Sequence, residues 1–71
     1  MNAFEAKKLK MGDLVRVIGT RTMLPEMVGE TLTVEQVLHG GSFVVCSCVW
    51  RGVPHRGAVD CMDIAREGDE A

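Results

Sequence analysis

The stretch TLTVEQVLHGGSFVVCSCVW, residues Thr31–Trp50, decides the fold because it contains two β-prone runs separated by a tight-turn sequence. Thr31–Leu38 alternates apolar and polar residues with a period of two, which is typical of a half-buried strand. His39–Ser42 carries adjacent glycines, which supply the positive φ angles that tight hairpin turns need. Phe43–Trp50 is apolar and β-prone. The sequence therefore predicts an antiparallel hairpin at the centre of the chain.

A strand and a loop are expected before the central hairpin. Leu14–Ile18 is rich in β-branched residues and bounded by glycines, so it predicts a first strand. Thr20–Glu30 has no sustained hydrophobic period and predicts a long loop. In the strand that follows this loop, we expect Leu32, Val34 and Gln36 to share one face.

Two segments after the hairpin complete the other side. Val53–Val59 predicts a fourth strand, and Pro54 places it at a sheet edge because proline cannot donate to a ladder. We expect its pairing to begin near His55. Cys61–Arg66 predicts a single helical turn or a short closing strand that carries Met62 and Ile64 inward. Short strands at intervals of about ten residues favour a compact barrel or sandwich.

The ends of the chain set the domain boundaries. Residues 1–10 predict an N-terminal helical turn that packs Phe4 and Leu9 onto the core. Residues 11–66 predict one β domain, and residues 67–71 predict an acidic tail that frays. A chain of 71 residues is too short for a second independent core.

Composition and charge exclude several classes of protein. The net charge is −2, whereas nucleic-acid binders usually present an excess of clustered Lys and Arg. No apolar run has the length of a membrane span, and the first residues lack the apolar stretch of a signal peptide. We therefore expect a cytoplasmic protein. Its three cysteines, an odd number, are expected to be free or bound to metal.

The sequence carries no pattern typical of an enzyme. Phosphate-loop, dinucleotide and metalloprotease motifs are absent from it. A catalytic cysteine would need a nearby base, and either Cys48 or Cys61 can be paired with His55, but no feature of the sequence fixes that geometry. The carboxylates of the last twelve residues are expected to lie in a solvated polar tail rather than in a pocket; they are Asp60, Asp63, Glu67, Asp69 and Glu70. We expect a non-enzymatic protein with no cofactor.

A metal site is a second possibility that the sequence raises. Cys46 and Cys48 lie at i and i+2 on one strand face, and a turn could return His55 beside them, with Cys61 as a fourth ligand and His39 in reserve. One residue between two cysteines is fewer than the usual zinc knuckle has. Cysteine among apolar residues is more often a small buried hydrophobe, so we favour core cysteines over zinc.

A local binding surface is the third candidate. The turn Arg51–Gly52 places basic side chains around an aromatic residue, and Arg and Trp are enriched at interface hot spots. Ordinary core packing of Trp50 and scattered surface charge are the competing interpretations. The candidate binding residues are Trp50, Arg51, His55, Arg56, Arg16 and Arg21, with Phe43 expected nearby.

The methionines have two possible roles, because Met fills gaps in small cores and also lines adaptable binding surfaces. We expect Met11 and Met62 to fill gaps. For the loop pair Met23 and Met27 both roles stay open.

Three segments carry a resemblance to a known group. Lys10–Val17 (KMGDLVRV), Val28–Val37 (VGETLTVEQV) and Val44–Trp50 (VVCSCVW) resemble the YodC-like group of small bacterial proteins, and the chain also resembles KOW-type segments of ribosome- and transcription-associated proteins. The resemblance implies a small SH3-like barrel of about five short antiparallel strands with a short N-terminal helical turn. The longer first loop, the second cysteine and the GVPHRG hairpin depart from the YodC-like pattern.

The YodC-like group has no settled activity, so the resemblance implies a fold and not a function. We expect a bacterial or phage accessory protein that binds another protein, with a homodimer possible through an exposed strand edge. The alternatives are a nucleic-acid-binding KOW- or Sm-like barrel and a small structural zinc-binding module.

Overall fold

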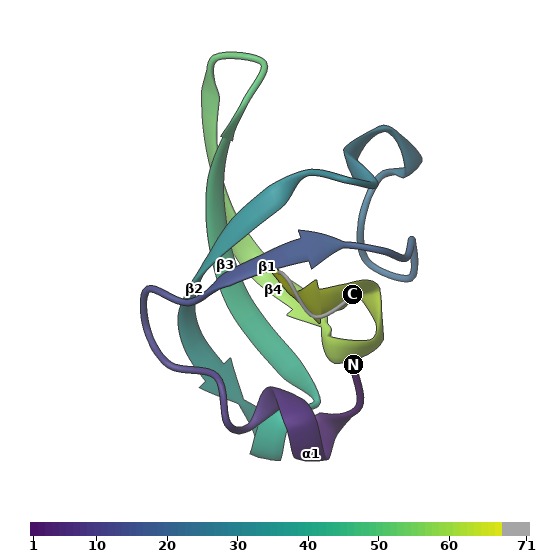
Figure 1. Cartoon of the computed structure of the whole chain (residues 1–71). Helices are drawn as coiled ribbons and strands as arrows, with labels where there is room; N and C mark the ends of the chain where they lie inside the picture. Colours follow the sequence, from purple (N-terminus) through teal and green to yellow (C-terminus); the bar gives the residue numbers. More distant parts are fainter. Residues whose placement is uncertain (68–71) are drawn as a thin grey trace.

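Five antiparallel strands form one sheet in the order β4-β3-β2-β1-β5 in the computed structural model, which describes residues 1–67 (Figure 1). The prediction of a small, mostly-β protein is therefore confirmed, whereas closure into an SH3-like barrel stays a prediction. The strands are β1 (Leu14–Val17), β2 (Thr31–Leu38), β3 (Phe43–Trp50), β4 (Val53–Asp60) and β5 (Ile64–Arg66). The short helices are α1 (Ala3–Ala6), η1 (Pro25–Met27), η2 (His39–Gly41) and η3 (Cys61–Asp63).

The central hairpin has the bounds that the sequence predicts, with β2 and β3 joined through η2. The β3–β4 hairpin projects beyond the rest of the sheet at its Arg51–Gly52 turn (Figure 1). Pairing in β4 begins at Val53 opposite Trp50, so our expectation of a start near His55 was wrong. Pro54 fits into the ladder opposite Val49 because β4 is an edge strand, as predicted.

A register shift in β2 changes which residue faces the core. The β2–β3 pairing is regular up to Val34 opposite Cys46 and resumes at Gln36 opposite Val45, which marks a bulge. The extra residue moves the alternation by one position, so Val37 packs against the core and Gln36 is exposed. The expectation that Gln36 shares the buried face was therefore wrong.

The core consists of small aliphatic residues drawn from every strand. The buried apolar residues are Ala6, Leu9, Val15, Val17, Met27, Leu32, Val34, Val44, Cys46, Val59, Cys61 and Ile64.

Leu9 and Ile64 point inward as predicted, but Phe4 is 61 % exposed, with the ammonium groups of Lys7 and Lys8 over its ring. Met11 and Met62 are exposed as well and do not fill gaps. Helix α1 is one turn long, so it buries Ala6 and leaves Phe4 outside.

Helix α1 packs against η2 at a point where only glycine fits. Gly41 has a φ of 101°, and a Cβ there would stand 2.2 Å from the carbonyl oxygen of Ala3. Gly40 also has a positive φ, but a Cβ there would meet open space. The two neighbouring glycines thus separate the effect of backbone conformation from that of close packing.

We expect Gly40→Ala to lower the free energy of unfolding by about 1 kcal/mol, the cost of a positive φ. Gly41→Ala should lower it by roughly 3 kcal/mol or more, because a backbone oxygen can yield only if α1 moves away. Urea unfolding of the two variants measures the difference. Equal losses would show that α1 does not pack as described.

Asp63 connects the long loop to η3 and is buried, so the expectation that it lies in a solvated tail was wrong. Its side chain is fully buried and accepts hydrogen bonds from the N–H of Arg21 (2.9 Å), the N–H of Thr22 (2.6 Å) and the Thr22 hydroxyl (2.6 Å). Its carbonyl oxygen accepts from the N–H groups of Ile18 and Gly19. Burial alone would raise the pKa of Asp63, but these side-chain bonds and the Arg21 charge lower it below its ordinary value of 3.8.

The lowered pKa gives Asp63 a pH-dependent share of the stability. The ionised form stabilises the fold above the pKa of the unfolded chain, near 4, and this share is lost as the pH falls through the lower folded-state pKa. Asp63→Asn should therefore cost roughly 2–4 kcal/mol at pH 7 and progressively less below pH ~4. Urea unfolding between pH 7 and 3 measures this. A gap between wild type and variant that stays constant with pH would contradict it.

Candidate functional site

The β3–β4 hairpin carries an aromatic and basic cluster at its tip. Its turn is made by Arg51 and Gly52, with φ angles of 53° and 77°. The Arg51 guanidinium lies 4.3 Å from the centre of the Trp50 ring, within cation–π range. The His55 ring contacts the edge of Trp50 at 5.9 Å between centroids. Trp50 is half-buried and packs against the core at the same time.

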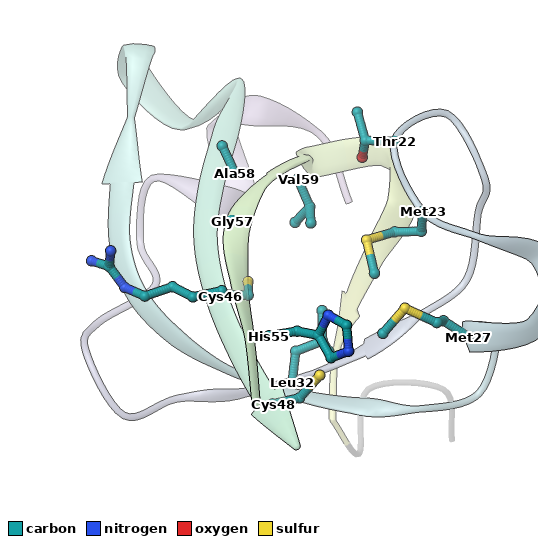
Figure 2. Close-up of a pocket in the computed structure, with 11 residues that line it drawn as sticks. Thr22, Met23, Met27, Leu32, Cys46, Cys48, His55, Gly57, Ala58 and Val59 are labelled. Atoms are coloured by element: carbon teal, nitrogen blue, oxygen red, sulfur yellow. The ribbon is translucent and has the colours of Figure 1, made fainter. Parts of the chain in front are cut away.

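A pocket of about 190 Å³ lies on the core-facing side of this hairpin. The cross-strand pair Cys48–His55 lines it from β3 and β4, and Met23 and Met27 line it from the long loop. Figure 2 shows both methionine side chains and the imidazole directed into the same space. Two elements that are distant in the sequence therefore form one pocket.

Gly57 leaves room for the pocket. It pairs with Cys46 across the sheet, so a side chain at this position would point to the core-facing side. A Cβ placed on Gly57 would have no atom within 4 Å, and its φ lies outside the left-handed region. Gly57 therefore needs no special backbone conformation, and its missing side chain leaves a gap in the lining.

The outer edge of β4 presents backbone groups that no strand pairs. The Asp60 N–H donates to the Thr22 hydroxyl at 2.9 Å, so it points away from β3. Alternate residues of an antiparallel strand point the same way, which places the backbone groups of Ala58 and Arg56 and the carbonyl of Pro54 on this edge. Within residues 1–67 the outward groups of Arg56 and Ala58 make no hydrogen bond.

The structure brings together three of the six predicted binding residues, namely Trp50, Arg51 and His55. Arg56 belongs to the pocket lining, but it pairs with Ser47 across the sheet, and its side chain lies on the opposite face with its Nε 3.6 Å from Glu35.

The remaining three aromatic and basic residues lie elsewhere. Arg16 forms an ion pair with Glu67, the one described residue of the predicted tail; residues 68–71 lie outside the described part. Arg21 is in the long loop beside Asp63. Phe43 stands at the far end of β3 from Trp50 and contacts His39, so the expectation that it joins the tip was wrong.

The cysteines occupy different surroundings. Cys46 and Cys48 line the pocket together with His55, whereas Cys61 is buried in η3 and does not line it. Within residues 1–67 no group of three or more His, Cys, Asp or Glu side chains is arranged to hold a metal ion. The four zinc ligands considered from the sequence are therefore not brought together.

Neither pocket cysteine has the environment of a nucleophile. Burial raises the pKa of Cys46 to about 12, with further contributions from Cys48 and Glu35. Burial and the Glu30 charge also raise the pKa of Cys48. A reactive cysteine needs a lowered pKa. The raised pKa values disfavour the thiolate form of both cysteines.

Sequence reasoning missed Gly57 and left Met23 and Met27 undecided. Pairing between β3 and β4 begins at Trp50 opposite Val53, and this register places Gly57 opposite Cys46, on the core-facing side. The methionines lie in a loop without hydrophobic periodicity, so periodicity could not indicate where their side chains point. Their spacing of four residues around Pro25, at the first position of η1, was the available signal.

Comparison with known proteins gives no relative. The chain matches no protein-family model, and no curated protein or solved structure is significantly similar to it. None of the helices in the described residues is long and apolar enough to cross a membrane.

The pKa of Cys46 predicts a low reactivity with thiol reagents. A pKa of about 12 in place of 9.0 reduces its thiolate fraction at pH 8 by about a thousandfold. We expect iodoacetamide to modify Cys48, which is only half-buried, well before Cys46 in the folded protein. Mass spectrometry of digested samples taken over time measures the order. Modification of Cys46 at the rate of a free thiol would contradict the buried placement.

Proposed function

We propose that this protein is a non-enzymatic binding module that recognises another protein by pairing an extended segment of it with the free edge of β4. The observation that carries the proposal is the row of outward backbone groups at Arg56 and Ala58 that have no partner within residues 1–67. An extended peptide can add a strand to such an edge through main-chain hydrogen bonds.

The surroundings of the edge support a peptide as the occupant. Every residue of β4 from Val53 to Ala58 is exposed, so nothing in the described part covers the strand. At the hairpin tip, Val49 is 71 % exposed and Val53 is 54 % exposed, next to Trp50. Apolar and aromatic side chains beside a free edge supply the area that backbone pairing alone lacks.

Nucleic-acid binding by a KOW- or Sm-like barrel is less well supported. Arg16 and Arg56, two of the four arginines on which it would depend, already stand beside Glu67 and Glu35. The net charge of −2 also opposes phosphate binding. SH3-like closure of the sheet, a bacterial or phage origin and a cytoplasmic location belong to the same proposal.

A proline on the edge tests this function. Ala58→Pro removes one outward N–H, while Ala58→Val keeps it and suits a strand. In an affinity pull-down from a nuclease-treated lysate, we expect the proline variant to capture at least about tenfold less partner protein than wild type does. The reason is that edge pairing depends on the N–H that proline lacks. The valine variant should behave as wild type, and circular dichroism checks that both variants are folded.

Two further arms separate the competing explanations. The double variant Trp50→Ala, Arg51→Ala should weaken capture if the hairpin tip contributes. Gel filtration over a range of concentrations detects pairing of β4 with a second copy of the chain. In that case the partner is the protein itself, and it forms a homodimer. Loss of all retained material after nuclease treatment would overturn the proposal and favour nucleic acid.

A further inference from the structure

Four side chains with a sulfur or imidazole donor line the pocket behind the β3–β4 hairpin. Met23 and Met27 contribute thioether sulfurs, Cys48 contributes a thiol and His55 an imidazole. Figure 2 shows the side chains of Met23 and Met27 and the His55 ring extending into the same space, with the Cys48 sulfur beside the ring. The loop supplies one pair of ligands and the hairpin supplies the other.

We propose that this pocket binds a single monovalent soft metal ion, Cu(I), through Met23, Met27, Cys48 and His55. Thioether and thiolate ligands select Cu(I), whereas Mg²⁺ and Ca²⁺ require oxygen ligands. Among residues 1–67, no carboxylate side chain lines the pocket. The proposal is independent of peptide binding at the β4 edge.

The charge balance also favours a monovalent ion. When Cu(I) binds, the Cys48 thiol loses its proton to solvent and forms the metal–sulfur bond, and copper stays in the +1 state without electron transfer. One thiolate cancels the single positive charge, and the other three ligands are neutral. The pocket can therefore take up the ion without gaining net charge. Zn²⁺ with one thiolate would leave an unbalanced positive charge, and it prefers four Cys or His ligands.

Core packing is the competing explanation for the methionines, and it makes a different prediction. Met27 is 6 % exposed and belongs to the core, so packing alone would explain its burial. Met23 is only partly buried and packs against the core from outside. If both methionines merely fill space, leucine should replace either without changing metal affinity.

Competition with the chelator bicinchoninate under anaerobic conditions tests the site. We expect the wild-type protein to take up one equivalent of Cu(I). We expect Met23→Leu and Met27→Leu each to weaken binding at least about tenfold, because losing even a residue that only hydrogen-bonds to a metal ligand costs about that much affinity. Met11→Leu is the matched control, because Met11 is 82 % exposed and remote from the pocket lining. It should bind as wild type.

Two further measurements guard against loss of fold. Gly57→Leu keeps all four ligands and fills the space beside them, so it should weaken Cu(I) binding while circular dichroism shows an intact sheet. In wild-type protein, addition of Ag(I), a redox-inert substitute, should shift the NMR signals of the Met23 and Met27 methyl groups and leave that of Met11 unchanged. Wild-type affinity in both methionine variants would overturn the proposal.

Discussion

The buried carboxylate of Asp63 is the constraint on which the candidate sites depend. It receives three hydrogen bonds from Arg21 and Thr22, and the Thr22 hydroxyl in turn accepts the N–H of Asp60 at the end of β4. A single charged group thus fixes the base of the long loop to η3 and to the edge strand. The side chain of Gly19 must be absent for this approach, because a Cβ there would stand 2.8 Å from an Asp63 oxygen.

Fixing the base of the loop determines where its methionines lie. Met23 follows Thr22 directly, and Met27 ends the 3-10 turn that Pro25 begins. Both face the Cys48–His55 pair because the loop returns along the same side of the sheet to begin β2. The pocket is therefore a consequence of loop anchoring combined with the missing side chain of Gly57, and no strand of the sheet forms it alone.

Local sequence signals predicted the elements but not the long-range placements. The alternation and the glycine turn of Thr31–Trp50 gave the bounds of β2 and β3, because these signals act between near neighbours in the chain. The bulge after Val34 carries no such signal, since it depends on the partner strand. Asp63 looked like part of a solvated acidic segment, although its burial is set by loop N–H groups more than forty positions away. The Trp50, Arg51 and His55 cluster was predictable because a tight turn joins its members.

The hairpin therefore offers two separate kinds of chemistry. Its edge exposes backbone groups, which recognise the extended shape of a segment whatever its side chains are. Its core-facing side presents soft side-chain atoms in a pocket, which select by chemical type. His55 contacts Trp50 at the hairpin tip and also lines the pocket, so the tip and the pocket share this residue. A ligand held by His55 would hold the imidazole in one orientation, and the Trp50–Arg51 tip packed against it would become more rigid. Metal binding in the pocket would then reduce the conformational entropy that the tip loses when a partner contacts it.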